Sequence, residues 1–186
     1  TTAADYLIPT PTAPETPTDA VCRKLGVDKH CETATTPLPG SEERSYEAVA
    51  QKIWEKPSMA QKAAASRLGT GAFHIQSGDR QDEALICECE EVSVGEIKFA
   101  IERMDATTLT DLRRRTRVGM GTCQGEFCAC RAAGLLAKAH GCVEKERKGL
   151  AEFLQERWKG NFPIGWGDTL REAEYTQWVY KHVLGL

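Results

Sequence analysis

The sequence predicts a mostly α-helical protein, in which an irregular proline-rich segment precedes a small helical domain and a set of C-terminal helices. Three observations predict this class. Six of the eight prolines fall between Pro9 and Pro39, which excludes long helices and central strands there. From Ser45 onward, apolar residues recur at helical spacing, several times directly after a capping-box pair. Glycines then follow most of these periodic stretches, where a helix C-cap is expected.

The N-terminal part of the chain is expected to be connector and linker. The chain begins at Thr1, without a methionine or a signal-like apolar segment, so we expect it to be cut from a longer polypeptide. Ser58 and Gln61 have capping-box spacing at the start of one expected helix. Residues 1–44 are expected to form an extended connector, with a short helix between Asp19 and Gly26. Residues 45–83 are expected to form a helical linker and loop. Its helices should span 45–55 and 58–68, and its loop 69–82.

Residues 84–142 are expected to form the central domain. Ser93 and Glu96 make a capping box for one helix, and a shorter helix over 108–115 follows after a brief turn, which gives the pair a helix-turn-helix character. A further helix is expected from about 127 to 140. The residues expected to face the core are Val94, Ile97, Ile101, Met104, Leu109, Leu112, Ala132, Leu135, Leu136 and Ala139.

Residues 143–186 are expected to form C-terminal helices that pack on this domain. The first of them should bury Leu150, Phe153, Leu154 and Trp158, which recur at helical spacing. The expected bounds are 144–159, ended by Gly160, and 169–184, opened by Thr169 and Glu172 in capping-box spacing.

Charge and hydropathy argue against two classes of partner. The 24 lysines and arginines nearly balance the 27 aspartates and glutamates, so we expect no general attraction to nucleic acid or anionic lipid. The basic run at 113–117 follows two short helices, as in DNA-binding modules, but the charge balance favours a solvated face or a dock for an acidic partner. No apolar run is long enough to cross a bilayer, so we expect no direct membrane span.

Four cysteines form the pattern that points to chemistry. Cys87 and Cys89 are one residue apart, Cys123 and Cys128 have four residues between them, and 33 residues separate the two pairs. Eight cysteines in a chain with no sign of secretion favour metal binding or redox chemistry over disulfides. Four converging thiolates are the commonest ligand set of an iron–sulfur cluster. Because side chains at i and i+2 diverge on a helix, we expect both pairs in irregular loops beside helices.

The residues around the second pair suit such a cluster. Gly119, Gly121 and Gly125 allow positive φ and close backbone approach, so that N–H groups can point at the sulfurs. A structural zinc site is the alternative, although C-x-C lies outside the usual zinc spacing. Cys130 is the alternative to Cys128 as the fourth ligand. Nearby positive charge, which would favour the reduced cluster, comes from Arg113, Arg114, Arg115, Arg117 and Arg131.

The other cysteines and the histidines are assigned no function. Cys142 follows a helix-ending glycine and is expected to pack, whereas Cys22 and Cys31 are expected to be unpaired thiols. The histidines at 30, 74, 140 and 182 do not combine with a plausible nucleophile and an orienting acid into a catalytic triad. We therefore expect them at surface or helix-end positions. No G-x-G-x-x-G follows an expected strand, so a dinucleotide would bind outside this chain. We therefore expect no complete active site here, and no catalytic residue.

The stretch from Leu85 to His140 resembles the bacterioferritin-associated-ferredoxin-like (BFD-like) [2Fe–2S] domain, a small helical fold with its ligands on two loops. The motifs that carry this resemblance are CEC, the two-helix segment after it, and GMGTCQGEFCACRAAG. From residue 19 onward the chain is also similar to the C-terminal part of the large (A) subunit of anaerobic glycerol-3-phosphate dehydrogenases, through DAVCRKLG, TATTPLPG, FLQERWKG and WGDTLREAEYTQWVY. The stand-alone ferredoxins have a two-residue gap in the second pair, where four residues separate Cys123 from Cys128.

The resemblance implies that Cys87, Cys89, Cys123 and Cys128 bind a [2Fe–2S] cluster in an electron-transfer module. The parent enzyme would be FAD-dependent and quinone-linked, and would oxidise sn-glycerol 3-phosphate to dihydroxyacetone phosphate. Its FAD would bind in an upstream domain of the same polypeptide, and electrons would leave through further subunits, including a membrane-associated iron–sulfur subunit. The complex would be peripheral on the cytoplasmic side of the inner membrane. The alternative is a structural zinc or iron–sulfur interaction domain without electron transfer.

Overall fold

The computed structural model describes residues 17–28, 36–38, 40–43, 45–75 and 80–186 of the chain. The chain divides into two compact units, Thr1–Leu38 and Pro39–Leu186. In the first unit, helix α1 spans Pro17–Lys24, and Gly26 follows it with a φ of 69°, which confirms the expected short helix and its glycine signal. Most of the expected connector lies outside the described residues.

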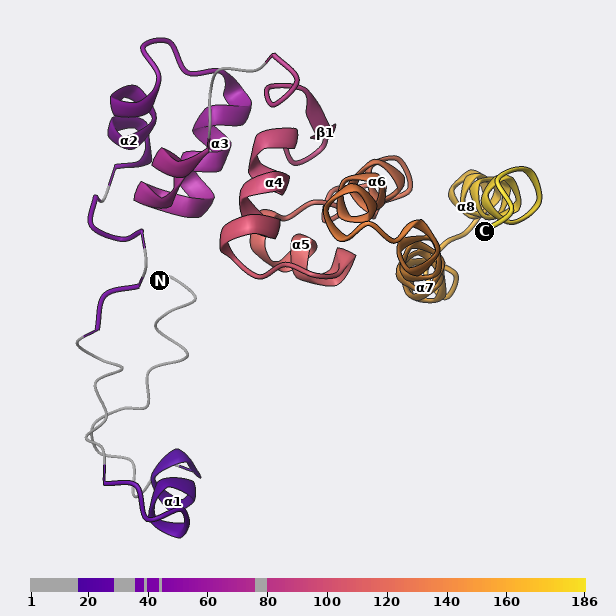
Figure 1. Cartoon of the computed structure of the whole chain (residues 1–186). Coiled ribbons are helices and arrows are strands. Elements are labelled where there is room, and N and C mark those ends of the chain that lie inside the picture. The colour runs from indigo at the N-terminus through magenta and orange to yellow at the C-terminus, as the bar shows by residue number, and fades with distance from the viewer. Residues whose placement is uncertain (1–16, 29–35, 39, 44, 76–79) are drawn as a thin grey trace. The chain divides into compact units, whose positions relative to one another are not determined.

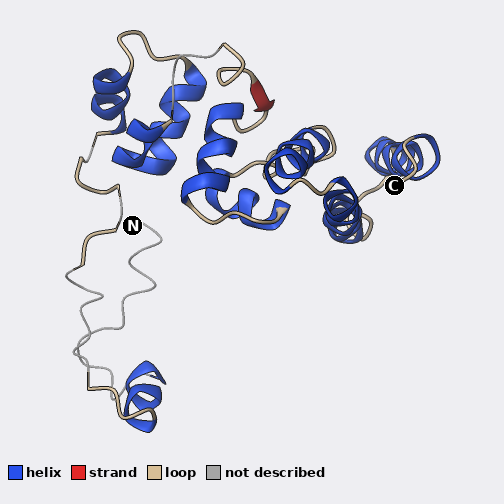
Figure 2. Ribbon diagram, viewed as in Figure 1, coloured by secondary structure: helices blue, strands red, loops and turns tan. Residues whose placement is uncertain are grey.

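The second unit is mostly helical, which confirms the expected fold class (Figure 1). Its described residues contain one two-stranded sheet, whose first strand is the red arrow in Figure 2. No helix among the residues described in either unit is both long and apolar enough to cross a membrane. In chain order the elements are α2 (Tyr46–Ile53), α3 (Met59–Leu68), the 3₁₀-helix η2 (Gly69–His74), β1 (Leu85–Cys87), β2 (Val92–Ser93), α4 (Val94–Arg103), α5 (Leu109–Thr116), α6 (Cys128–His140), α7 (Val143–Asn161), α8 (Asp168–Trp178) and the π-helix η3 (Val179–Val183).

Capping boxes start helices α3 and α5. Ser58 accepts the N–H of Gln61 while the Gln61 side chain accepts the N–H of Ser58, as the sequence spacing predicts. Thr108 and Asp111 make the same reciprocal pair at the start of α5. These contacts satisfy N–H groups that have no partner inside the helix, so they define where each helix starts.

The capping box predicted at Ser93 is only half formed. Ser93 accepts the N–H of Glu96 at the start of α4, but the Glu96 carboxylate does not return the contact. The Glu96 side chain is instead fully buried and forms a two-pronged ion pair with Arg67 of α3, at 2.7 and 2.6 Å. A buried carboxylate needs such a partner because leaving it unpaired is costly. The ion pair therefore joins α4 to α3.

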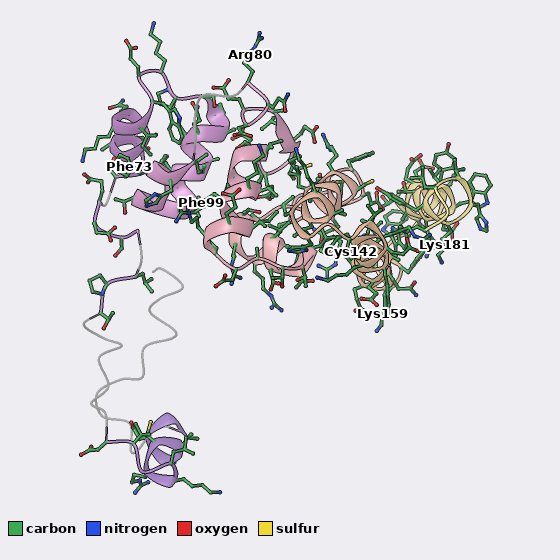
Figure 3. All side chains as sticks on the ribbon, in the orientation of Figure 1. Phe73, Arg80, Phe99, Cys142, Lys159 and Lys181 are labelled. Atoms are coloured by element: carbon green, nitrogen blue, oxygen red, sulfur yellow. The ribbon has the colours of Figure 1, made fainter. Side chains whose placement is uncertain are left out.

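Two hydrophobic clusters form the core of the second unit. The smaller lies among α2, α3 and η2, and Phe99 packs against it from the side of α4 nearest α3 (Figure 3). A loop was expected over 69–82, but Gly69–His74 forms η2 and contributes to this cluster. The larger cluster joins the β hairpin to α4, α5, α6, α7 and η3. Its most buried large apolar side chains are Ile97, Leu112, Leu136 and Leu154.

Helices α6 and α7 bury the faces that the periodicity predicts, with two exceptions. Ala139 is exposed, because the buried face of α6 runs from its first turn to Leu136 and no further. Gly160 does not end α7, which continues to Asn161. A glycine inside a helix costs about 1 kcal/mol relative to alanine, which is too little to end a well-packed helix. The buried residues that match expectation are Ala132, Leu136, Leu150, Phe153, Leu154 and Trp158.

The last helix differs from its predicted start. The capping pair expected at Thr169 and Glu172 is wrong, because α8 starts at Asp168 after Gly167, which has no side chain to cap it. Helix α8 has no buried residue of its own and passes directly into η3. Tyr180 of η3 is buried in the larger cluster, so the π-helix is the part of this segment that enters the core.

Candidate iron–sulfur site

The first cysteine pair lies on the β hairpin. Strand β1 ends at Cys87, which pairs with Val92 of β2. The Cys87 thiol is buried, whereas Cys89 lies in the following turn and is exposed. Both were predicted in irregular backbone, but Cys87 belongs to a strand. The strand therefore fixes the direction of the Cys87 side chain, whereas the conformation of the turn fixes that of Cys89.

Arginines from three elements contact the turn between the strands. Arg131 of α6 donates to both carboxylate oxygens of Glu88, at 2.7 Å each. Arg117, which follows α5, pairs with the Glu90 carboxylate at 2.8 Å. Arg67 of α3 donates to the backbone carbonyl of Glu90 at 3.0 Å and to the next carbonyl at 3.3 Å. The turn is thus attached to three helical segments.

Glycines shape the loop between α5 and α6, which carries Cys123. Gly119 and Gly125 have φ values of 75° and 98°, a region that other residues rarely adopt. At Gly121, an added Cβ would lie 2.3 Å from the Cβ of Cys89. The absence of a side chain at Gly121 therefore allows this loop to meet the β1–β2 turn. The close approach predicted from the three glycines is confirmed.

All four predicted ligands line one open hollow of about 370 Å³. Cys123 lies in a turn, but Cys128 is the buried first residue of α6, so only part of the second pair is in irregular backbone. The Sγ atoms of Cys89 and Cys123 lie 4.0 Å apart. The lining residues are Cys87, Glu88, Cys89, Cys123, Phe127, Cys128 and Arg131.

The two buried thiols differ in proton affinity. A hydrogen bond with Cys128, helped by the N–H groups of Gly119, Glu90 and Cys89, lowers the pKa of Cys87 to about 6. The same contact and burial raise the pKa of Cys128. Of the two buried thiols in the hollow, Cys87 is therefore the one that loses its proton more readily. The thiolate is the form that binds a metal.

Burial and hydrogen bonding shift the pKa of the Cys123 thiol in opposite directions. Burial raises the pKa of Cys123, while the N–H groups of Gly125 and Phe127 act in the opposite direction by donating toward the sulfur. Backbone N–H groups from both segments thus point at sulfur atoms, as the glycine pattern predicts. Such donors stabilise negative charge on the sulfurs.

The arginines expected to balance a cluster's charge are largely engaged elsewhere. Arg115 donates to the carbonyl of Met104 at 2.5 Å, and Arg113 to the Gln124 side chain at 3.4 Å. Of the five arginines predicted, Arg131 lines the hollow, and Glu88 opposes its charge. The positive field at the hollow is therefore weaker than the arginine count suggests.

Cys130 and Cys142 do not line the hollow. Cys130, the alternative fourth ligand, is exposed and does not line it. Cys142 was expected to pack, but it is exposed as the N-cap of α7, where α6 passes into α7 (Figure 3). A residue between two helix ends has few neighbours to bury it, which explains the difference. Cys22 is half-buried, and Cys31 lies outside the described residues.

The three described histidines occupy surface or helix-end positions, as expected. His74 is exposed and stacks on Phe99, with ring centroids 6.1 Å apart. His140 ends α6, and its Nδ1 lies 3.0 Å from a Glu146 carboxylate oxygen. His182 is exposed, and the prediction for the histidine at position 30 falls outside the described residues.

The four thiols meet as two pairs, Cys87 with Cys128 and Cys89 with Cys123. Across the part of the chain that the structure describes, no three or more His, Cys, Asp and Glu side chains form a group that could hold a metal ion. Structural zinc needs four ligands within about 2.3 Å of one point. A [2Fe–2S] cluster divides four thiolates between two irons, so paired thiols suit it better than they suit one ion.

Two further residues support the site and were missed by sequence reasoning. Besides Arg67, Tyr180 of η3 donates its hydroxyl to the carbonyl of Glu126 in the second loop. Burial raises the pKa of Tyr180 to about 12, so the hydroxyl keeps its proton at neutral pH. The sequence offered one signal for Arg67, which is that it directly precedes the buried Leu68 in α3. Tyr180 offered none, because its partner is 54 residues away.

A known domain class coincides with this site. Residues 85–138 match the family model of the BFD-like [2Fe-2S] binding domain. The match covers the hairpin, α4, α5, the glycine-rich loop and most of α6, and so includes all four thiols. A BFD-like domain is thus present in the chain.

The similarity to curated proteins extends well beyond that domain. The A subunit of the anaerobic glycerol-3-phosphate dehydrogenase of Escherichia coli strain K12 is 49% identical over 170 residues, covering 91% of this chain and 31% of that protein. The corresponding A subunit of Haemophilus influenzae is 46% identical over 170 residues, covering 91% and 30%. The A1 subunit of Haloferax volcanii is 37% identical over 166 residues, covering 89% and 27%.

These matches confirm both resemblances drawn from the motifs. The chain spans about 30% of the length of the curated relatives it matches. No solved structure matches it significantly.

Proposed function

We propose that the chain is the electron-transfer [2Fe–2S] module of a FAD-dependent, quinone-linked glycerol-3-phosphate dehydrogenase. Cys87, Cys89, Cys123 and Cys128 are its cluster ligands in this proposal. The observation that carries it is that these four thiols, from two segments separated by 33 residues, line one hollow. When bound, the cluster supplies one-electron acceptance and donation.

The residues around the hollow fit such a group. Thiolates are the usual ligands of a [2Fe–2S] cluster, and Cys87 already has a lowered pKa. Backbone N–H groups from the turn and the loop donate toward Cys87 and Cys123, which suits an anionic centre. Gly121 keeps a side chain out of the place where the two segments meet, and Gly125 leaves room for the Phe153 ring beside the loop.

The hollow has a buried end and an open end. Cys87 and Cys128 are buried and anchor the site in the core of the domain. Cys89 is exposed, and Phe127 at the rim is 68% exposed. The open end is the side on which an electron donor or acceptor would approach, because electron transfer requires a short path from the cluster to the surface.

The place of this module in a larger enzyme is also proposed. The relatives are named as A subunits, which supports an assembly with further subunits. In the proposal, FAD binds in an upstream domain of the same polypeptide and oxidises sn-glycerol 3-phosphate to dihydroxyacetone phosphate. Electrons then pass from this module to quinone through a membrane-associated iron–sulfur subunit, on the cytoplasmic side of the inner membrane. The module alone would not turn over glycerol 3-phosphate.

Anaerobic purification of the 186-residue chain tests the proposal. We expect about two iron and two sulfide per chain, with a visible charge-transfer spectrum that dithionite bleaches and reoxidation restores. One zinc per chain without sulfide, or a cluster that cannot be reduced reversibly, would overturn it.

Serine substitutions then test the ligand set. Cys87→Ser, Cys89→Ser, Cys123→Ser and Cys128→Ser should each remove the native spectrum, because an alcohol is a poor ligand for these irons. Cys130→Ser and Cys142→Ser are matched controls, since both thiols are exposed and lie outside the hollow. If Cys128→Ser kept the native spectrum and Cys130→Ser lost it, the fourth ligand would be Cys130 and not Cys128.

A further inference from the structure

Arg67 lies outside residues 85–138, which match the domain model, yet its guanidinium reaches the β1–β2 turn. Nη1 donates to the carbonyl of Glu90 at 3.0 Å, and Nη2 to the carbonyl of Glu91 at 3.3 Å. Nε and Nη2 also donate to the two carboxylate oxygens of Glu96, at 2.7 and 2.6 Å. One side chain of α3 therefore ties the turn to the start of α4.

The turn depends on such an external contact. Glu91 has a φ of 52°, a left-handed conformation that is unfavourable for a residue with a Cβ. The flanking strands contain only three and two residues, so their hydrogen-bond ladder is short. The two other ion pairs of the turn each include an arginine whose side chain is at least 40% exposed, so solvent screening keeps them weak. The Arg67–Glu96 pair is buried, with side chains 12% and 0% exposed, so its geometry is fixed by packing.

Glu90 connects Arg67 to the sulfur atoms. Its carbonyl accepts from Arg67, and its N–H donates toward the Cys87 sulfur, as does the N–H of Cys89. A displaced turn would change these N–H···S contacts. It would also change the 4.0 Å separation between the Cys89 and Cys123 sulfurs.

We infer that Arg67 is a positioning residue for the iron–sulfur site. It holds the Cys89-bearing turn in place, and thereby sets how firmly the cluster is retained and how well backbone N–H groups reach the Cys87 sulfur. This inference rests on the proposed function, because it concerns the same four thiols. It extends the support of the site from the BFD-like domain to helix α3.

The double variant Arg67→Met/Glu96→Met separates positioning from stability. Replacing a buried ion pair by apolar residues of similar volume is often neutral for folding, so we expect the Tm to stay close to that of the wild type. The contacts to the Glu90 and Glu91 carbonyls are lost all the same. In metal-free protein, hydrogen exchange at the amides of the turn should become about tenfold faster.

The cluster itself supplies two further readouts in the same variant. Its visible absorbance should decay at least about fivefold faster under a chelator, because the turn no longer holds one ligand in place. Its midpoint potential should move to more negative values, since fewer N–H groups stabilise the reduced state. Lys62→Met, an exposed change on the same helix, should alter none of the three readouts.

The outcomes are distinguishable. A folded double variant with wild-type exchange, decay and potential overturns the inference. A wild-type chain that assembles no cluster overturns the proposed function instead, while the exchange measurement still tests the positioning role. If the double variant does not fold, Arg67→Lys replaces it, because lysine keeps a charge for Glu96 but cannot serve two carbonyls in fork geometry. Wild-type behaviour of Arg67→Lys in all three readouts would also overturn the inference.

Discussion

The β1–β2 turn and the α5–α6 loop reach the same hollow, but they are held by different parts of the protein. The turn has an unfavourable φ at Glu91 and is held from outside, by arginine side chains of three other elements. The loop is held mainly by its own backbone, through glycines of positive φ and internal N–H···O=C bonds such as Gln124 to Gly121 at 2.9 Å. From outside the loop, Tyr180 donates to the carbonyl of Glu126 and Arg113 donates to the Gln124 side chain.

This difference determines how each segment responds to substitution. Backbone conformation is nearly all-or-none, because a Cβ either fits at a close approach or displaces its neighbour. Side-chain contacts are graded, since each contributes according to its burial. The loop should therefore fail abruptly when a glycine is replaced, whereas the turn should weaken in steps.

The largest effect is expected at Gly121. In Gly121→Ala the new methyl group would lie 2.3 Å from the Cβ of Cys89, so the loop and the turn must move apart. We expect cluster content to fall to background, with a loss of about 1–3 kcal/mol in the free energy of unfolding of the metal-free protein. Iron and sulfide analysis and urea unfolding measure the two effects.

Gly134→Ala is the matched control, because a Cβ at this position in α6 meets nothing within 4 Å. It should keep its cluster and gain about 0.5–1 kcal/mol of stability from the higher helix propensity of alanine. Normal cluster content in Gly121→Ala would show that the close approach of the two segments is not needed for binding.

An intermediate effect is expected at Tyr180. Tyr180→Phe removes the hydroxyl that donates to the carbonyl of Glu126, which leaves this loop carbonyl without its donor. We expect a loss of about 1–2 kcal/mol in the free energy of unfolding, with the cluster retained but lost faster on exposure to air. Tyr175→Phe on α8 is the control, because Tyr175 is exposed and its change should stay within about 0.5 kcal/mol. Equal effects of the two changes would contradict a holding role for Tyr180.

The sequence predicts best what short-range physics decides. The capping box at Ser58 and the buried faces of α4 to α7 are set by residues within a turn or two of each other, which is why spacing and periodicity find them. The cysteine spacing likewise identified four thiols that the structure brings to one hollow. Their role as cluster ligands stays a prediction.

Several failures depend on what residues far away in sequence contribute to a position, or do not contribute to it. Glu96 has capping-box spacing after Ser93, but a buried arginine 29 positions earlier attracts its carboxylate more strongly than one N–H does. Cys142 reads as a packing residue after Gly141, yet no other element covers that junction enough to bury it. The supports of the site, Arg67 and Tyr180, act across the fold and leave little trace in the local pattern.

The smallest effect is expected at the exposed ion pair between Glu88 and Arg131. Arg131 holds the pKa of Glu88 below its ordinary value of 4.5, so the pair stabilises the folded state above that pH. The contribution is lost as the pH falls through the folded-state pKa. Because both side chains are well exposed, solvent screening limits the contribution of this ion pair to less than about 1 kcal/mol at neutral pH.

Urea unfolding of Glu88→Gln at pH 7 should show this small loss in the free energy of unfolding, and at pH 3 the difference from the wild type should shrink. The same difference should shrink at about 1 M salt. A loss as large as that in Tyr180→Phe would mean that surface charge holds the turn, and that the buried Arg67 contact is not its main support.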